Sequence, residues 1–318
     1  MSDIANKGPP HLGHLVEVYA TLLIAGGQAG LPIIILTFLF AKNVHRHPTV
    51  VNFCITMIIY SIVFCLLIYG GQYRLGHPNK ALCIAQASMI MGTLPMMCVA
   101  ALVLVFQLWV TFQEPGSKIF NTCSNIYIKI ALLVAPYTAL LGYAVAGIII
   151  GVSRPEVVKP SNGLYCFHKL NSIRRYAEPI PCLILLAATA GFEVAILVQW
   201  YRRWYKVKRN FPLATRKLGA MVCLRAGLFT LYSWVALGSS ISFVFDTVPA
   251  LPYMIEAGLP VAAFIVFATQ RDVIEAWCFW RRTSDNGIGR RPSTAALLEN
   301  EGGSPMESVH RQSWQVRV

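Results

Sequence analysis

ALCIAQASMIMGTLPMMCVAALVLVFQLWVTFQ, residues 81–113, is the longest stretch of this chain without an aspartate, glutamate, lysine or arginine. A helix needs about 20 mostly apolar residues to cross the roughly 30 Å hydrocarbon core of a bilayer, and this stretch exceeds that length. Across all 318 residues, 56% are hydrophobic and only 13% are charged, which is about half the charged share of an ordinary soluble domain. So few charges could not cover a soluble core of this size. The sequence therefore predicts an integral membrane protein.

Six further stretches have the length and composition of a spanning helix. Val18–Ala41, Thr49–Tyr73 and Ile130–Ser153 carry no charge, and three later stretches carry a single charge each. A membrane β-barrel does not fit, because its strands would alternate polar and apolar residues. We therefore predict an all-α fold, a seven-transmembrane helix bundle with spans at residues 15–41, 49–71, 82–113, 126–152, 179–201, 217–245 and 251–270.

The distribution of lysine and arginine orients the bundle, because cytosolic loops carry an excess of both. With the N-terminus outside, 18 basic residues lie on the cytosolic side and eight lie outside, while Arg225 falls within a span. We therefore predict a multi-pass plasma-membrane protein, with residues 1–14 as a short extracellular N-terminus and residues 283–318 as a disordered cytoplasmic tail. Most of the basic residues behind the net charge of +13 then lie where anionic inner-leaflet lipids attract them. The charge therefore does not indicate nucleic-acid binding.

Two cysteines stand on the predicted outer side of the membrane. Cys83 begins the third span, and Cys166 lies in the second outer loop, residues 154–178. In an oxidising compartment the two could form a disulfide that holds this loop over the bundle. Two free thiols, or a bridge that uses Cys182 instead, are the alternatives, and spacing alone does not choose among them.

The predicted inner surface is basic. The segment YRRWYKVKRNFPLATRK carries seven basic residues, for which we predict contact with anionic lipid headgroups or with a cytosolic partner: Arg202, Arg203, Lys206, Lys208, Arg209, Arg216 and Lys217. Residues 271–282 are then predicted to form a short amphipathic helix that lies on the inner leaflet as an eighth helix. Trp277 of this helix is predicted to lie at headgroup level. Its Cys278 is a candidate for palmitoylation, and an unmodified buried thiol is the alternative.

A search for catalytic motifs is negative. The sequence contains no G-x-S-x-G, no H-E-x-x-H and no glycine-rich phosphate loop. Retinal would need a lysine in the last span for its Schiff base, and residues 247–270 contain none. The histidine pairs His11/His14 and His45/His47 are interpreted as solvated surface rather than metal ligands. We therefore predict a protein that is not an enzyme, with no cofactor and no metal.

Polar side chains at the predicted outer mouth are candidates for a ligand pocket: Glu17, Tyr143, Asp246, Tyr253 and Glu256. With the basic residues of the outer loops, they would accommodate a polar or anionic small molecule.

Two charged residues lie at matching depth in the fifth and sixth spans. Glu193 and Arg225 each lie about 12 Å from the inner end of their helix, at 1.5 Å per residue. Ionisable residues at that depth usually face the bundle and pair. We therefore predict an inner switch pair that holds the two helix ends together. The alternative is that Arg225 extends to the lipid headgroups while Glu193 is protonated.

The predicted architecture resembles a G-protein-coupled receptor. The shared features are seven spans, an outer N-terminus, a cysteine at the start of the third span, another in the second outer loop and an amphipathic helix after the seventh. Three segments are similar to seven-helix receptor-like proteins of basidiomycete fungi: RHPTVVNFCITMIIYSIVFCLLIYGGQ from Arg46, LCIAQASMIMGTLPM from Leu82 and FATQRDVIEAWCFW from Phe267. The resemblance covers residues 15–282. It implies a receptor that senses an extracellular ligand and signals to a cytosolic heterotrimeric G protein.

The chain departs from rhodopsin-like receptors at three motifs. The inner end of the third span reads FQLWVTFQEP and has no arginine, the seventh span reads GLPVAAFIVFATQ instead of carrying Asn-Pro-x-x-Tyr, and the sixth lacks Cys-Trp-x-Pro. The switching residues of that class therefore cannot be carried over to this sequence.

Two other functions are considered. A secondary transporter would be expected to contain internal repeats and several carboxylates within its spans. The halves of this chain show no such similarity, and only Glu193 and Glu256 lie well within spans. The second alternative is a receptor-shaped membrane protein that does not couple to a G protein.

Overall fold

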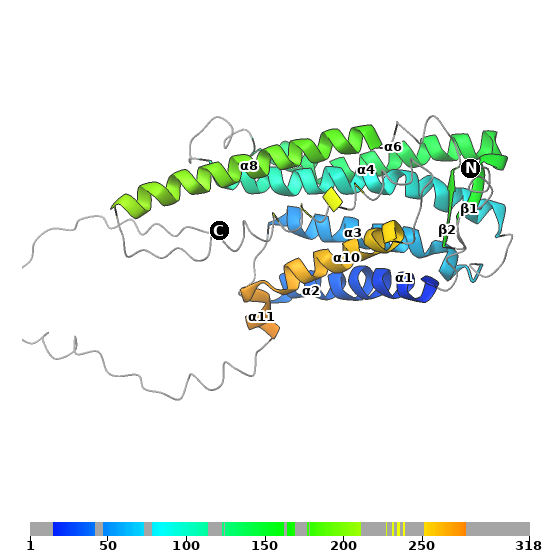
Figure 1. Cartoon of the computed structure of the whole chain (residues 1–318), viewed down its shortest axis with the longest axis horizontal. Coiled ribbons are helices and arrows are strands. Elements are labelled where there is room, and N and C mark those ends of the chain that lie inside the picture. The colour runs from blue at the N-terminus through cyan, green and yellow to red at the C-terminus, as the bar shows by residue number, and fades with distance from the viewer. Residues whose placement is uncertain are drawn as a thin grey trace, which may run out of the picture. The chain divides into compact units, whose positions relative to one another are not determined.

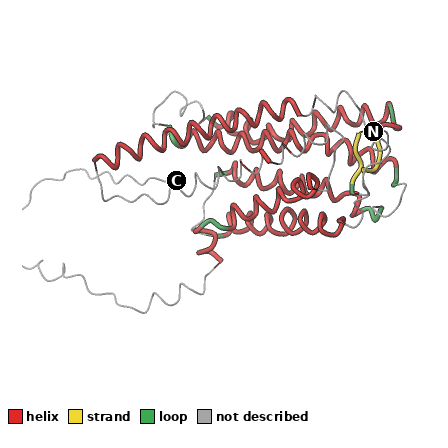
Figure 2. Tube along the Cα trace, in the orientation of Figure 1, coloured by secondary structure: helices red, strands yellow, loops and turns green. Residues whose placement is uncertain are grey.

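The computed structural model describes residues 15–41, 47–72, 78–113, 123, 125–161, 164–168, 177, 179–210, 227, 231, 234–235, 238 and 251–277. These residues are mostly helical (Figures 1 and 2). The predicted N-terminal segment, the predicted tail and Cys278 lie outside them.

Five helices are long and apolar enough to cross a membrane, and they confirm five predicted spans as apolar helices of that length. The first of them joins α1 (Val16–Leu23), the π-helix η2 (Ile24–Gly30) and α2 (Leu31–Phe40). The other four are α3 (Pro48–Tyr69), α4 (Lys80–Thr111), α6 (Ile126–Ser153) and α8 (Pro179–Asn210).

The last predicted span is found as α10 (Leu251–Ala268), an apolar helix shorter than the other five. The predicted sixth span, residues 217–245, lies outside the described residues except for five isolated positions, each of which is helical: 227, 231, 234, 235 and 238. The described residues therefore establish a helical membrane-type protein, with the count of seven still a prediction.

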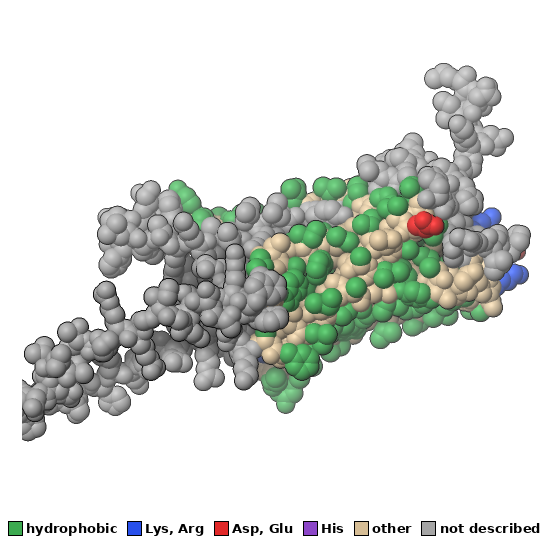
Figure 3. All heavy atoms as spheres, turned by 90° about the horizontal axis from the view of Figure 1, so that it is seen from below, with side chains coloured by type: hydrophobic (Ala, Val, Ile, Leu, Met, Phe, Trp, Pro, Cys, Tyr) green, Lys and Arg blue, Asp and Glu red, His purple; other side chains and the backbone are tan. Residues whose placement is uncertain are grey.

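The helices are arranged around α4, which packs against α3, α6 and α8, while the first helix packs against α3 and α10. Large apolar side chains such as Phe40, Leu141 and Val152 lie exposed on the outside of the bundle. Figure 3 shows one face covered by hydrophobic side chains, with the visible lysine and arginine side chains at one end. An apolar surface along the helices suits contact with lipid tails.

Glycines allow the first helix to approach its neighbours closely. A Cβ on Gly26 would lie 2.5 Å from the backbone nitrogen of Val261 in α10, and one on Gly27 would lie 2.4 Å from the Cβ of Ser61 in α3. The Ser61 hydroxyl donates to the Leu23 carbonyl at 2.7 Å. Small residues at such contacts let helix backbones pack together within a membrane. The contact therefore joins η2, α3 and α10.

The end of the fifth predicted span differs from the prediction. The helix α8 continues to Asn210, so the first half of the predicted inner basic loop is helical. Its 32 residues extend about 48 Å, and Figure 1 shows α8 reaching beyond α3 and α10. Hydropathy marks where a span leaves the apolar layer, whereas lysine, arginine and tyrosine do not end a helix.

The predicted all-α fold needs a second correction, because the predicted outer loop contains a β-hairpin. The short 3₁₀ helix η3 (Pro155–Val157) leads into β1 (Val158–Ser161), which pairs antiparallel with β2 (Tyr165–His168). Each strand has four residues, too short for a clear alternating pattern to predict it.

The amphipathic helix is found as α11 (Arg271–Trp277), while residues 278–282 of the prediction lie outside the described residues. Val273 is buried, and the Trp277 indole nitrogen donates to the Thr37 hydroxyl of α2 at 2.9 Å. Trp277 therefore packs against the end of α2, where its N–H finds a partner; its predicted position at headgroup level stays a prediction.

His47 caps the N-terminus of α3, and its protonation is expected to weaken this cap. Its Nδ1 atom accepts a hydrogen bond from the Thr49 backbone nitrogen, which requires an unprotonated Nδ1. Burial, and then the nearby Lys129, lower the pKa of the His47 imidazole from its usual 6.5.

Because the folded pKa is lowered, the stabilisation is complete above pH 6.5 and is lost as the pH falls toward the folded pKa. Thermal unfolding of the protein in lipid nanodiscs is expected to shift to lower temperature between pH 7.5 and 5.5. His47→Asn supplies a helix cap that does not titrate, so its shift should be smaller. Equal shifts in the two proteins would contradict this role.

Candidate functional site beneath the hairpin

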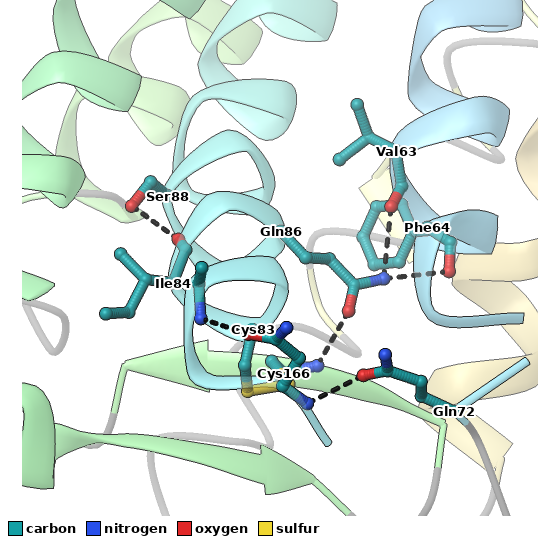
Figure 4. Close-up of a disulfide and its surroundings, with 10 residues drawn as sticks. Val63, Phe64, Gln72, Cys83, Ile84, Gln86, Ser88 and Cys166 are labelled. Atoms are coloured by element: carbon teal, nitrogen blue, oxygen red, sulfur yellow. Dashed lines mark hydrogen bonds between the residues drawn. A yellow bond between two sulfur atoms is a disulfide. The ribbon is translucent and has the colours of Figure 1, made fainter. Parts of the chain in front are cut away.

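The β-hairpin is joined to the helices through the cysteine pair that the sequence singles out. The sulfur atoms of Cys83, on α4, and Cys166, on β2, lie at disulfide distance, 1.90 Å (Figure 4). Cys182 therefore takes no part in this bond, and it is buried instead beside Cys98 and Leu186. The bond holds one strand of the hairpin at the start of α4.

Gln86 provides a second link between the hairpin and the helices. Its side-chain nitrogen donates to the carbonyls of Val63 and Phe64 on α3, at 3.2 and 3.3 Å. Its side-chain oxygen accepts from the Cys166 backbone nitrogen at 3.1 Å. Figure 4 shows this amide between the end of α3 and the hairpin. One fully buried side chain thus connects α3, α4 and β2.

Gln86→Met, which keeps the length of the side chain, is expected to loosen the hairpin. The buried Cys166 backbone nitrogen would lose its acceptor, and an unsatisfied buried donor costs about 1–3 kcal/mol. Hydrogen–deuterium exchange should therefore speed up in residues 164–168, whereas exchange in α6 should stay the same. Unchanged exchange in the hairpin would show that the amide is not a link.

An aromatic cluster lies directly beneath the hairpin. The ring of Tyr165, on β2, stacks near Tyr19 of α1 at 6.4 Å between centroids, and it meets Phe64 of α3 edge-on at 5.3 Å. Tyr253 of α10 lies 6.1 Å from the same ring. Tyr60 extends the cluster along α3, 4.6 Å from Phe64. Tyr165 therefore forms the centre of a group of rings that comes from three helices.

A proline explains how Tyr60 connects to α10. Pro260 lies inside α10 and has no backbone N–H, so it leaves the carbonyl of the residue four positions earlier, Glu256, without its helical partner. The Tyr60 hydroxyl donates to this Glu256 carbonyl at 3.1 Å. The side chain from α3 thus replaces the hydrogen bond that the proline removes.

The cluster also has a carboxylate close by. Glu256 is half-buried on α10. Its carboxylate lies within electrostatic reach of the Tyr19 hydroxyl, and the hydroxyls of Tyr60 and Tyr165 do so too. Among the described residues, no lysine or arginine is buried. Arg154 is exposed near the hairpin. The described charge at this site is therefore negative.

The structure brings together two of the five ligand-pocket candidates, Tyr253 and Glu256. Glu17 is exposed. Tyr143 lies on α6, away from the cluster, and its hydroxyl donates to the Ala177 carbonyl at 3.2 Å. Asp246 lies outside the described residues.

Four cluster residues were not predicted: Tyr19, Tyr60, Phe64 and Tyr165. The sequence offered one signal for Tyr165, its position beside Cys166, because the residue next to the predicted disulfide is held at the bundle.

Some of the residues predicted at the inner surface are described, and they lie at the end of the bundle opposite the hairpin. Glu193 is half-buried on α8 and Arg202 is exposed, and the helical end of α8 also contains Arg203, Lys206, Lys208 and Arg209. Arg216, Lys217 and Arg225 lie outside the described residues, so the predicted Glu193–Arg225 pair stays a prediction.

Several buried polar atoms at this opposite end have no hydrogen-bond partner. Among the residues with described side chains, they include Trp109 Nε1 and Gln113 Nε2 of α4, Gln199 Oε1 of α8 and Gln270 Oε1 after α10. Buried polar groups are nearly always hydrogen-bonded, so these four atoms are exceptions among the described side chains.

No family model matches this chain, and no curated protein sequence matches it either. The fold and site define a helical, membrane-type protein with a hairpin-covered aromatic cluster at one end and a basic helix extension at the other. Any functional proposal therefore rests on this geometry.

Proposed function

We propose that this protein is a seven-helix plasma-membrane receptor that senses an extracellular ligand and signals to a cytosolic heterotrimeric G protein. The main supporting observation is the hairpin that Cys83–Cys166 joins to α4, above an aromatic cluster with a carboxylate at its side. A few polar groups among aromatic side chains are typical of small-molecule sites. The sequence resemblance to fungal seven-helix receptor-like proteins supports the same function.

Two further helices complete the proposed bundle. α10 serves as the seventh span, and residues 217–245 form the sixth. The five described positions in that range are helical, which is consistent with a helix through all of them. In the proposed bundle, α8 ends on the inner side and α10 starts on the hairpin side. The chain must therefore cross the membrane once between them, and a spanning helix at residues 217–245 provides that crossing.

The end opposite the hairpin is the proposed surface for the G protein. α8 carries five basic residues in its last nine positions, and such a cluster attracts both anionic lipid and an acidic protein surface. Glu193 and Arg225 form the proposed ion pair that favours the closed state.

The proposed orientation predicts where glycosylation occurs. The sequence has no Asn-x-Ser/Thr acceptor of its own, so an acceptor inserted after Ser161 should be modified in cells. One inserted after Phe211 should not be. The gel shift on deglycosylation reads out both variants. Modification at the second site alone would reverse the topology and remove the receptor function.

Nucleotide exchange tests the proposed function directly. The purified protein in lipid nanodiscs should accelerate exchange on at least one of a panel of fungal Gα subunits when a suitable ligand is added. A variant in which Arg202, Arg203 and Lys206 are replaced by glutamate should bind the ligand but not accelerate exchange. Substrate flux in proteoliposomes without any G protein would instead favour a secondary transporter.

A further inference from the structure

We propose that the aromatic cluster binds an organic cation, an ammonium group on an aromatic or apolar body, and that the Tyr165 ring occupies the place of this ligand in the resting protein. The proposal rests on the proposed function, because it assigns the ligand class of the same site.

The rings favour a cation by their geometry. Tyr19, Phe64 and Tyr253 surround a single position from three different helices, with centroids 5.3–6.4 Å from the ring at its centre. A cation within about 6 Å of an aromatic face is attracted by the quadrupole of the ring. The Tyr19 ring lies closest to parallel with the ring at this position, at 29°, so its face is the one best placed to attract an ammonium group.

The charges favour the same sign. Glu256 lies within electrostatic reach of Tyr19, at the edge of the cluster. No buried lysine or arginine is found in the described part of the chain, and Arg154 and Lys159 near the hairpin are exposed. The sequence interpretation of an anionic ligand assumed that such basic residues line the mouth. The described ones are exposed and not buried in the cluster, whereas the Glu256 carboxylate lies at its edge.

The central ring belongs to the hairpin and not to a membrane-length helix. Tyr165 is 4% exposed and Leu164 is fully buried, so the start of β2 and the residue before it insert two side chains into the bundle. Because the surrounding rings already contact Tyr165, a ligand needs that ring to move. Its removal breaks no helix. The phenol therefore acts as a tethered occupant that a ligand of similar size displaces.

Matched probes test the ligand class without a G protein. The protein in nanodiscs is titrated with 2-phenylethylammonium, the neutral 2-phenylethanol and the anionic 3-phenylpropanoate, with thermal stability and saturation-transfer NMR as readouts. The cation should bind about tenfold more tightly than either of the others. Glu256→Gln should remove this preference and leave binding of the neutral probe unchanged.

Removal of the occupant should strengthen binding. Tyr165→Ala is expected to bind the cation at least about tenfold more tightly than the natural protein does, because no ring needs to be displaced. Phe53→Ala is the control: Phe53 is equally buried, toward the other end of α3, so its cavity should accept the neutral probe without preferring the cation. If Tyr165→Ala does not fold, Tyr165→Leu takes its place.

The proposal is overturned if the natural protein binds the three probes equally, if Glu256→Gln keeps the cation preference, or if loss of the Tyr165 ring weakens binding. Because no G protein is present, a failure of nucleotide exchange leaves these results standing. Conversely, an anionic preference would overturn the ligand class while the receptor function stays open to the exchange experiment.

Discussion

Gly92→Ala is expected to lower the stability of the protein more than any other single methyl addition on α4 or α6. A Cβ at Gly92 would lie 2.5 Å from the backbone oxygen of Leu140 and 3.1 Å from its Cα. Backbone atoms cannot avoid the clash by a change of rotamer, so α4 and α6 would have to separate. Overpacking costs about 1–3 kcal/mol, and we expect the upper end of that range.

Other glycines provide matched controls for this substitution. Gly142 lies on the exposed face of α6 with nothing within 4 Å of its ideal Cβ, whereas Gly147 on the same helix would meet the Cα of Ser88 at 2.9 Å. Gly142→Ala should keep or raise the thermal midpoint, because alanine favours a helix by up to about 1 kcal/mol. Gly147→Ala should fall between the two. Similar midpoints for Gly92→Ala and Gly142→Ala would contradict the close packing of α4 with α6.

Cys83→Ala and Cys166→Ala are each expected to destabilise the protein strongly, and the double variant should add little to either. The bond spans 83 residues of sequence, and the chain-entropy estimate for a loop of this size is about 4 kcal/mol. Helices held in a membrane restrict the unfolded chain already, so the measured loss should be smaller. Loss of the bond also frees the strand that carries Tyr165.

Thermal unfolding with and without reductant measures this effect. Cys54→Ala is the control, because Cys54 is a free thiol buried on α3. It should lose only the packing of one sulfur atom and respond to reductant as the natural protein does. Alkylation under non-reducing conditions should leave Cys83 and Cys166 unlabelled after denaturation. Labelling of both would show that the bond does not form in the protein.

The sequence was sufficient for the features that depend on local composition. A run of apolar residues predicts a spanning helix wherever it lies, because the hydrocarbon core leaves backbone groups no partner except their own helix. Residues 81–113 therefore predicted α4, and the two outermost cysteines predicted the pair at disulfide distance. Tyr253 and Glu256 could be chosen because polar groups are rare in such spans.

The end of α8 marks the limit of this reasoning. Hydropathy ends the predicted span near Tyr201, yet the helix continues to Asn210. Backbone hydrogen bonds continue wherever the residues tolerate a helix, whether lipid or water surrounds them. The β-hairpin is a similar case, since Val158–Ser161 and Tyr165–His168 are too short to be predicted from their pattern, and Cys166 joins the second strand to α4.

The inward face of each helix was decided only by the tertiary structure. In a soluble protein, polar residues mark the outer face, whereas lipid-facing and core-facing residues are both apolar in a membrane. Val18 and Tyr19 are neighbours in sequence, but Val18 is half exposed and Tyr19 is 1% exposed beside Tyr165. The sequence by itself thus determined the apolar runs, the candidate cysteines and the rare charges, whereas the structure chose Cys166 over Cys182 as the partner of Cys83. Only the packing of the helices and the hairpin brought four tyrosines, Phe64 and Glu256 together, because their convergence depends on contacts as distant in sequence as that between Tyr60 and Glu256.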